Sequence, residues 1–471
     1  MSIEIRESQW NGAEAAALRL EMDTELRPRY ADLFASKPAY PAVDVEAIVL
    51  TLVAFDGDLP VGTASLKNTD GYSEVKRVFV AASHRRRNLG AALLTAVEEH
   101  AAALGVTDLV LQTGLRQPEA IALYEREGWR PIPPFGPYAA DTEISRCFAK
   151  PLAPLFVAVE LPAVGEPATL VPRSIAALRE FAEAGVDLAV IADDLRAAPA
   201  GLARIDAPTL AAFAAPTVAG IGLAPAISTT HTEPFHLSKV VQTLDHASHG
   251  RAAWQVVVST SEEESAHFGR KTAVDSGQAW AEAEEAIEVA ERLWDSWEDD
   301  AEIRDVATGR FIDRERVHHI DFEGSYFSVR GPSIVPRSPQ GRPPIIVSAT
   351  DDASLDVAVR RADIIRVAPG LVAQARSGVD RAGRDGAVTV LVDVAVASAD
   401  TLTATLATLR HDTGADGVVL VFAETPDAAD YTDTLAPFVR SERPDAPTLR
   451  DRLRLERPVS RYVRALEGAL S

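Results

Sequence analysis

The sequence predicts an α/β protein with two domains: a mixed α/β domain at residues 1–150 and a (β/α)8 TIM-like barrel at 155–471. Three observations support this prediction. The chain has 471 residues, more than one ordinary domain needs. A short proline-containing stretch, Lys150-Pro-Leu-Ala-Pro154, separates two different patterns. Beyond it, apolar strand-like runs alternate with amphipathic helical runs, as they do in a parallel barrel.

The charge balance limits the classes of partner. Lysine and arginine total 47 against 69 aspartate and glutamate residues, which gives a formal net charge of −22. Such an acidic surface repels nucleic acid and anionic lipid, so we expect neither nucleic acid nor a membrane as partner. Cys147 is the only cysteine and the start lacks an apolar signal core, so we expect a cytoplasmic protein. The histidines lack metal-ligand spacing, and we expect no metal site.

In the first domain, apolar runs predict strands and alanine- and leucine-rich runs predict helices. Asp56-Gly57-Asp58 lies between two apolar runs and predicts a hairpin. We expect strands at 3–5, 48–55, 61–66, 73–80, 109–112 and 144–148, and helices at 13–22, 91–104 and 119–126.

The stretch from Val78 to Leu94 joins a strand to a helix through a basic turn with three arginines. The unpaired N–H groups at the helix start, the helix dipole and the arginines together predict a pyrophosphate site. The spacing Arg85-x-x-Asn88-x-Gly90 resembles the acyl-CoA-binding signature of the GNAT N-acetyltransferases, in which a glycine stands at the position of Asn88. Asparagine tolerates the left-handed backbone region, so we expect the turn to form.

A second signature, from Gln117 through Tyr124 to Gly128-Trp129, resembles another GNAT motif, with Gln117 in place of an asparagine. The resemblance implies that Tyr124 protonates the departing thiolate, and Glu74 is our candidate base, acting directly or through water. The alternatives are that Tyr124 only packs and that Glu74 is a solvated strand-end carboxylate. Glu21, Tyr30, Tyr40 and the tail ending at Tyr138 are expected to line the acceptor side. The resemblance implies acetyl-CoA as cosubstrate, bound by Phe79, Val80, Arg85, Arg86, Arg87, Asn88, Leu89, Gly90, Ala91 and Gln117.

The second domain carries the alternating pattern of a barrel. The uncharged tract 208–230 is broken by prolines and glycines, so it predicts a short helix and a buried strand rather than a membrane span. We expect strands at 155–159, 188–193, 218–227, 254–259, 344–349, 364–367, 387–396 and 417–422, and helices at 174–184, 208–213, 234–247 and 280–297.

Segments such as Ser228-Thr-Thr-His-Thr-Glu-Pro-Phe235 and Leu293-Trp-Asp-Ser-Trp-Glu298 resemble the luciferase-like FMN-dependent monooxygenases. The resemblance implies small-molecule substrates, reduced FMN supplied by a separate flavin reductase, and a homodimer formed through the barrel. Around FMN it implies Asp193, Ser228, Thr229, Gln255 and Ala349. Asp193 has the alternative role of capping a helix.

The chain departs from this second family where the flavin phosphate is expected. Ala279-Trp280 replaces an Arg-Tyr pair, and the phosphate-facing turn reads Ala349-Thr-Asp351-Asp352. Carboxylates beside a phosphate repel it, so the flavin site looks degenerate. Three hypotheses remain: a bifunctional acetyltransferase and monooxygenase, an acetyltransferase with a scaffold or ligand-binding barrel, and a monooxygenase with an acyl-CoA-sensing domain.

Overall fold

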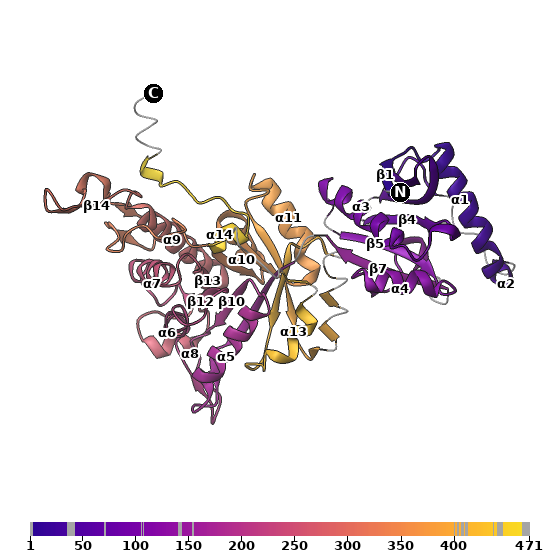
Figure 1. Ribbon diagram of the computed structural model, residues 1–471. Helices are drawn as coiled ribbons and strands as arrows, with labels where there is room; N and C mark the ends of the chain where they lie inside the picture. The colour runs from indigo at the N-terminus through magenta and orange to yellow at the C-terminus, as the bar shows by residue number, and fades with distance from the viewer. Residues whose placement is uncertain are drawn as a thin grey trace. The chain divides into compact units, whose positions relative to one another are not determined.

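The computed structural model describes residues 3–34, 43–69, 72–104, 106, 108–139, 144–152, 155–399, 401–402, 405–406, 409, 413–436, 438–439 and 446–463. The chain forms two compact units (Figure 1). The first comprises Met1–Pro154 and Thr403–Asp412, and the second comprises Leu155–Leu402 and Thr413–Ser471. Within the described part of the chain, no helix has the length and apolar character needed to cross a membrane.

The first unit is a seven-stranded sheet in the order β1-β2-β3-β4-β5-β7-β6, with helices packed against it. Its strands are β1 Ile3–Glu7, β2 Ile48–Asp56, β3 Leu59–Thr69, β4 Tyr72–Val80, β5 Asp108–Gly114, β6 Arg130–Ile132 and β7 Ser145–Pro151. The helices are α1 Ala13–Leu26, α2 Ala31–Phe34, α3 Leu89–Ala103 and α4 Pro118–Arg126, with 3-10 turns η1 Arg27–Tyr30, η2 Ala82–His84 and η3 Gly136–Tyr138. All six predicted strands and the three predicted helices are confirmed. Strand β6 was not predicted, because it is short and contains Pro131.

The pairing of β4 and β5 shapes the site of this unit. These two neighbouring strands are parallel, and their pairing ends at Val75 opposite Leu111. Beyond that point the strands part, so residues 76–80 of β4 lack a partner strand on this side. Their backbone groups need other partners, because unpaired backbone N–H and C=O groups are costly to bury.

A β-bulge interrupts β4 within the same stretch. Lys76 pairs with Ser65 and Phe79 with Thr63, so two residues of β4 stand opposite a single residue of β3. Arg77, in the bulge, has a φ of 56°. Bulges change the direction in which side chains project, and here Lys76 and its neighbour Arg77 both line one cavity.

The second unit is a closed barrel of eight strands in the order β10-β12-β13-β18-β19-β20-β21-β8, and every pair is parallel. The strands are β8 Phe156–Pro162, β10 Leu188–Ala192, β12 Gly222–Ser228, β13 Trp254–Val257, β18 Ile345–Ala349, β19 Ile364–Val367, β20 Thr389–Ala395 and β21 Gly417–Val421. Each predicted barrel strand is confirmed. The tract 208–230 folds as a short helix and a buried strand, as predicted. One core cluster of the barrel consists of apolar side chains, and Leu449, Leu453 and Leu455 of the tail belong to it.

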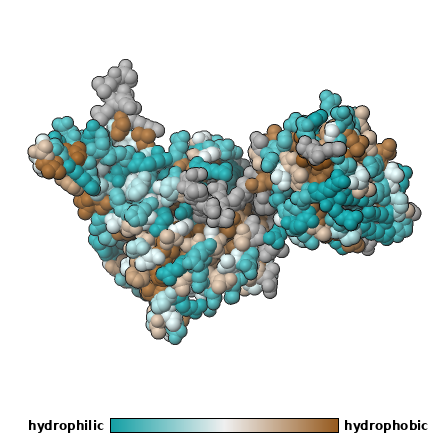
Figure 2. Space-filling model, in the orientation of Figure 1, coloured by the Kyte–Doolittle hydropathy of each residue, from teal (hydrophilic) through white to brown (hydrophobic). Residues whose placement is uncertain are grey.

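Helices surround the barrel strands: α5 Leu170–Glu183, α6 Ala207–Ala214, α7 Pro234–Ala247, α8 Glu262–Phe268, α9 Ser276–Asp295, α10 Asp352–Arg361, α11 Val372–Arg381, α13 Ala429–Leu435 and α14 Leu449–Arg452. Between α9 and β18 the chain forms two small hairpins that were not predicted, β14 Glu302–Asp305 with β15 Arg310–Ile312 and β16 Phe322–Glu323 with β17 Ser328–Val329. The β14–β15 hairpin exposes Ile303, Val306 and Phe311 (Figure 2).

Candidate functional site

The start of α3 is open in the first unit. Asn88 adopts the left-handed conformation, with φ 61° and ψ 13°, and its side chain does not cap the helix. The prediction that asparagine would support this turn is confirmed. Gly90 allows close packing, because a Cβ atom at this position would lie 3.0 Å from Leu123 Cδ2 of α4. The first amides of α3 are therefore left without a side-chain acceptor, and the helix dipole makes this end favourable for an anion.

A groove of about 1010 Å³ lies against this helix start. All the residues predicted to bind acetyl-CoA contribute to its wall except Arg87, which is exposed and is not among the lining residues. The groove is lined from that set by Phe79, Val80, Arg85, Arg86, Asn88, Leu89, Gly90, Ala91 and Gln117. A single cavity thus brings together the end of β4, the basic turn and the starts of α3 and α4.

Ion pairs hold part of the basic turn in place. Arg85 Nε donates to the carbonyl oxygen of Val80 at 2.9 Å, and its guanidinium group pairs with the carboxylate of Glu25. Arg29 also pairs with Glu25, at 3.0 Å. Arg86 has no ion-pair partner among the described residues. An anionic ligand would meet Arg86 directly and would compete with Glu25 for Arg85.

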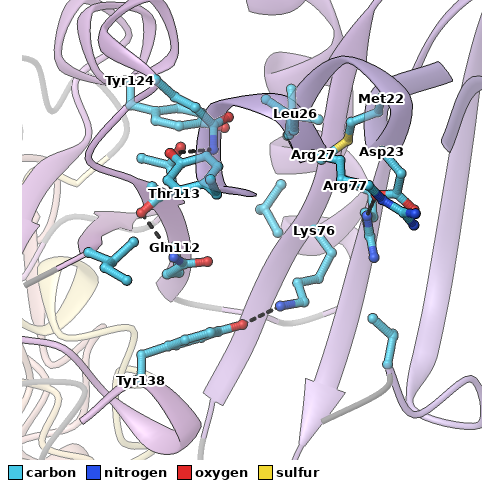
Figure 3. Close-up of a pocket in the computed structure, with 17 residues that line it drawn as sticks. Met22, Asp23, Leu26, Arg27, Lys76, Arg77, Gln112, Thr113, Tyr124 and Tyr138 are labelled. Atoms are coloured by element: carbon cyan, nitrogen blue, oxygen red, sulfur yellow. Dashed lines mark hydrogen bonds and ion pairs between the residues drawn. The ribbon is translucent and has the colours of Figure 1, made fainter. Parts of the chain in front are cut away.

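A second cavity, of about 500 Å³, adjoins the groove where β4 and β5 part (Figure 3). Residues that line both cavities mark the junction: Met22, Leu26, Val78, Gln117 and Tyr124. Of the predicted acceptor-side residues, Tyr30 and Tyr138 line the second cavity and Glu21 is not among its lining residues, whereas Tyr40 lies outside the described residues.

Tyr124 lies at this junction, where its ring packs against aromatic neighbours. Its residue surface is only 6% exposed, and its ring packs near Trp129 and Phe148, with centroids 6.2 and 5.8 Å away. Tyr124 nevertheless lines both cavities. Burial raises the pKa of its hydroxyl above the usual value for tyrosine, so the group keeps its proton at neutral pH.

Glu74 is buried, so the alternative that it is a solvated strand-end carboxylate is wrong. Its Oε1 accepts hydrogen bonds from Lys76 Nζ and from the Tyr138 hydroxyl, each at 3.0 Å. Lys76 Nζ also contacts the Tyr138 hydroxyl. Lys76 and Tyr138 line the second cavity, and Glu74 lies behind them. Burial and the neighbouring Glu74 raise the pKa of Tyr138. The carboxylate therefore connects with the cavity through these two side chains.

Several residues that line the second cavity were not predicted. Met22, Asp23, Leu26 and Arg27 occupy adjacent positions on one face of α1 and its continuation. Their i, i+1, i+4 and i+5 spacing was a readable signal that these side chains share a face. The side of the sheet to which Arg77 projects could not be predicted, because a bulge has no reliable signature in a single sequence.

In the barrel, a buried charged cluster occupies the interior. Arg366 is 4% exposed and donates to Asp393 at 2.9 Å and to Gln255 Oε1 at 3.2 Å, and it pairs with Glu160. Gln255 Nε2 lies within hydrogen-bonding distance of Ser348 Oγ, at 3.4 Å. Gln255, predicted to lie beside FMN, therefore already has protein partners at both ends of its amide.

Of the other residues predicted around FMN, the structure leaves one hydroxyl unpaired and gives two side chains partners within the protein. Ser228 Oγ is buried and has no hydrogen-bond partner within the described structure. Thr229 Oγ1 donates to the carbonyl of Val257 at 3.4 Å, and Ala349 is buried at the end of β18. Asp193 accepts from the amides of Leu195 and Ala207, both at 3.3 Å, so it binds the start of α6 in the manner of a cap.

The residues predicted to face the flavin phosphate do not fit that group. Asp351 caps α10 by accepting from the amide of Ser354 at 2.8 Å, and the two residues form a capping box. Ser276 Oγ donates to the same carboxylate, while Asp275 caps α9 by accepting from the amide of Gln278 at 2.9 Å. Carboxylates thus occupy both helix starts, where a phosphate would need positive charge or free amides.

Comparison with known proteins agrees with this two-part architecture. The model of the family described as luciferase-like monooxygenase matches residues 157–447, and the model of the acetyltransferase (GNAT) family matches residues 15–129. The EDTA monooxygenase EmoA from Chelativorans sp. BNC1 has a similar structure, with a TM-score of 0.58 at 21% identity over 65% of this chain and 99% of that one. At this identity the likeness shows the fold alone.

Three relatives by sequence cover different shares of this chain. The N-acetyl-S-(2-succino)cysteine monooxygenase of Bacillus subtilis (strain 168) is 39% identical over 193 residues, which are 40% of this chain and 44% of that protein. Nitrilotriacetate monooxygenase component A of Aminobacter aminovorans is 39% identical over 169 residues, 36% of this chain and 37% of that protein. The chain therefore spans less than half the length of these two curated relatives. One component protein of the pristinamycin IIA synthase of Streptomyces pristinaespiralis is 33% identical over 320 residues, 66% of this chain and 98% of that protein.

Proposed function

We propose, for a chain that belongs to the luciferase-like monooxygenase family and carries an N-terminal GNAT domain, that the first unit transfers an acetyl group from acetyl-CoA to a small-molecule amine. One observation supports this most strongly. The groove along the basic turn meets a second cavity at Tyr124, so a thioester in the groove and an amine in the cavity would meet beside a protonated hydroxyl.

The groove supplies binding and orientation. The open start of α3 and Arg86 face the pyrophosphate of the cosubstrate, and Arg85 exchanges its pairing with Glu25 for the same anion. The unpaired stretch of β4 around Phe79 and Val80 offers backbone N–H groups to the pantetheine chain and to the thioester oxygen. These donors stabilise the charge that develops on that oxygen.

The chemical step is direct transfer. The lone pair of the neutral amine attacks the thioester carbonyl carbon, a C–N bond forms, and the C–S bond breaks. Tyr124 donates its proton to the departing thiolate, so the products are an N-acetyl compound and free CoA. Glu74 receives the proton lost by the amine, which passes through the Tyr138 hydroxyl that already donates to it.

The test is release of CoA thiol by the full chain when acetyl-CoA is mixed with primary amines, with the acetylated product identified by mass spectrometry. We expect transfer with at least one amine and saturation by acetyl-CoA. Binding of acetyl-CoA without transfer to any amine would favour the acyl-CoA-sensing hypothesis instead.

A second candidate function belongs to the barrel, which we propose receives the acetylated product. The Bacillus subtilis relative is named for an N-acetylated, S-substituted cysteine. An N-acetyl group is what the first unit would install, so this name favours an order in which acetylation comes first. If the barrel oxygenates the product, its partner is a separate flavin reductase; the designation "component A" in another relative's name indicates a multicomponent system.

Flavin titration separates the hypotheses for the barrel. Quenching of flavin fluorescence by the full chain, measured with FMN and with riboflavin, reports whether a flavin binds and whether its phosphate contributes. Because the residues at the predicted phosphate position do not fit that group, we expect no preference for FMN. Consumption of oxygen with reduced flavin only when the acetylated compound is present would support sequential oxygenation, whereas its absence would favour a ligand-binding scaffold.

A further inference from the structure

We propose that the acceptor of the first unit is an amine that also carries a carboxylate, bound by the cationic wall of the second cavity. This inference rests on the proposed acetyltransferase function and names its substrate class. It comes from the charges of the cavity, from the side of the cavity on which they lie, and from the position of Tyr124 opposite them.

The cavity wall is cationic in a chain that is strongly acidic. Its charged lining residues are Asp23, Arg27, Lys76 and Arg77. Arg77 pairs with Asp23 at 2.6 Å, and Lys76 pairs at 3.0 Å with the buried Glu74 behind the wall. Arg27 is exposed and has no ion-pair partner among the described residues. Among its described residues the wall therefore carries one uncompensated positive charge, although the whole chain has a net charge of −22.

The local fold concentrates these cations. Arg27 follows the last turn of α1, on the same face as Met22 and Asp23. The β4 bulge brings Arg77 to the cavity beside Lys76, although neighbouring strand residues normally project to opposite faces. Figure 3 shows Arg27 and Arg77 with Asp23 on one side of the cavity, and Tyr124 on the other.

This arrangement specifies the two ends of the acceptor. Its amine must lie at Tyr124, because Tyr124 also lines the groove in which the thioester would lie. Its other end then reaches Arg27 and Arg77, whose guanidinium groups bind a carboxylate through paired N–H donors. One uncompensated cation matches the single charge of a carboxylate better than the −1.5 to −2 charge of a phosphate monoester.

The same charges help the reaction. They hold the carboxylate end of the acceptor on the side of the cavity opposite Tyr124, so the amine end is the one presented to the thioester. The carboxylate also anchors the acceptor at a fixed distance from the reacting carbon, which converts binding into orientation.

The experiment compares matched amines with the full chain and acetyl-CoA: amino acids, the corresponding amino acid amides, simple primary amines and phosphoethanolamine. We expect kcat/KM for the preferred amino acid to exceed that of its amide by about tenfold or more. An amide has the more acidic ammonium group, so a preference for the amino acid cannot come from a larger neutral fraction. Arg27→Gln should remove most of this preference by raising KM for the amino acid, while KM for acetyl-CoA changes little.

Arg130→Gln is the matched control, since Arg130 is exposed on β6 and lines neither cavity. We expect this variant to keep the preference. Equal turnover of amino acid and amide, or better turnover of uncharged amines or of phosphoethanolamine, would overturn the inference while leaving the acetyltransferase function intact. Absence of transfer to every amine would instead overturn the proposed function itself.

Discussion

Two helix starts, one in each unit, differ in how their first amides are used. The start of α3 was predicted to bind a pyrophosphate, and the start of α10 stands where the resembled family places its flavin phosphate. At α3 the N-cap is Asn88, in the left-handed conformation and without a side-chain cap, beside Arg85 and Arg86. At α10 the N-cap is Asp351, which forms a capping box with Ser354 and also accepts from Ser276. An open start keeps its amides for a ligand, and a capped start uses them within the protein.

The difference has an energetic side. A good N-cap stabilises a helix by about 1 kcal/mol, and a non-glycine residue held at positive φ costs on the order of 1 kcal/mol. The start of α3 lacks the stabilisation of a cap and includes a residue at positive φ. The start of α10 has a cap. This difference in local stability is what our proposal of an anion site at α3, and not at α10, requires.

The largest expected effect is on the rate of acetyl transfer, at the residue Tyr124 beside the start of α3. Tyr124→Phe should lower kcat for acetyl transfer by about 10² to 10³, because the thiolate then departs without a proton donor. The ring and its packing remain, so KM for acetyl-CoA should change little. Burial raises the pKa of Tyr124, so the acid form persists as pH rises, and the unmodified chain should keep its kcat up to about pH 10.

Thiol release can be followed with a thiol reagent, because Cys147 should contribute little background. Burial raises the pKa of this thiol to about 11, so its thiolate is scarce at pH 8. An unchanged kcat in Tyr124→Phe, with normal circular dichroism, would leave the residue only a packing role.

The next effect concerns the basic turn. Arg85→Ala combined with Arg86→Ala should raise KM for acetyl-CoA by about 10- to 100-fold, because two charge-assisted contacts to the pyrophosphate are lost. Arg87→Ala should have a smaller effect, since Arg87 is exposed and is not among the residues that line the groove. Equal effects of all three arginines would mean that the turn attracts the anion only through its total charge. Calorimetric titration with CoA distinguishes these outcomes.

A smaller effect, on the affinity for FMN, is expected when the carboxylate that caps α10 is removed. Asp351→Ser retains a capping hydroxyl and removes the carboxylate, so affinity for FMN should rise by about tenfold relative to riboflavin. Asp352→Asn is a useful comparison, because it removes a neighbouring charge without touching the cap. A preference for FMN over riboflavin in the unmodified chain would contradict our interpretation of this helix start. Fluorescence titration of each variant provides the measurement.

The smallest effect concerns the turn residue itself. Asn88→Gly should stabilise the first unit by up to about 1 kcal/mol, because glycine adopts positive φ without steric cost, and Asn88→Ala should destabilise it by a similar amount. Urea unfolding followed by a signal from the first unit measures both changes. The reverse order of stabilities would show that the asparagine side chain makes contacts that outweigh its backbone cost.

Much of the architecture was predictable because it depends on local patterns. Apolar runs such as Ile345–Ala349 and Gly417–Val421 identified every barrel strand, since a parallel strand buried on both faces is apolar along its length. The groove was predictable for a different reason. One nearly contiguous strand–turn–helix segment, from Phe79 to Ala91, supplies 10 of its 21 lining residues.

The second cavity was predictable only in part. Its wall combines α1, β4, β5 and the turn at Tyr138, and their juxtaposition depends on where β4 and β5 stop pairing. Nothing in the alternation of Ser73 to Val80 marks the end of that pairing. The partners of Glu74 were hidden for the same reason, because Tyr138 reaches it from a distant part of the chain.

The sequence by itself determined the two-part α/β architecture, the open helix start with its arginines, and the hydroxyl at Tyr124, because each is written within one short segment. Only the tertiary structure decided that Glu74 is buried, that Asp351 is a cap, and that Arg27, Lys76 and Arg77 share one cavity. Those facts depend on which distant side chains meet, and a side chain's charge has a consequence only once burial and partners are set.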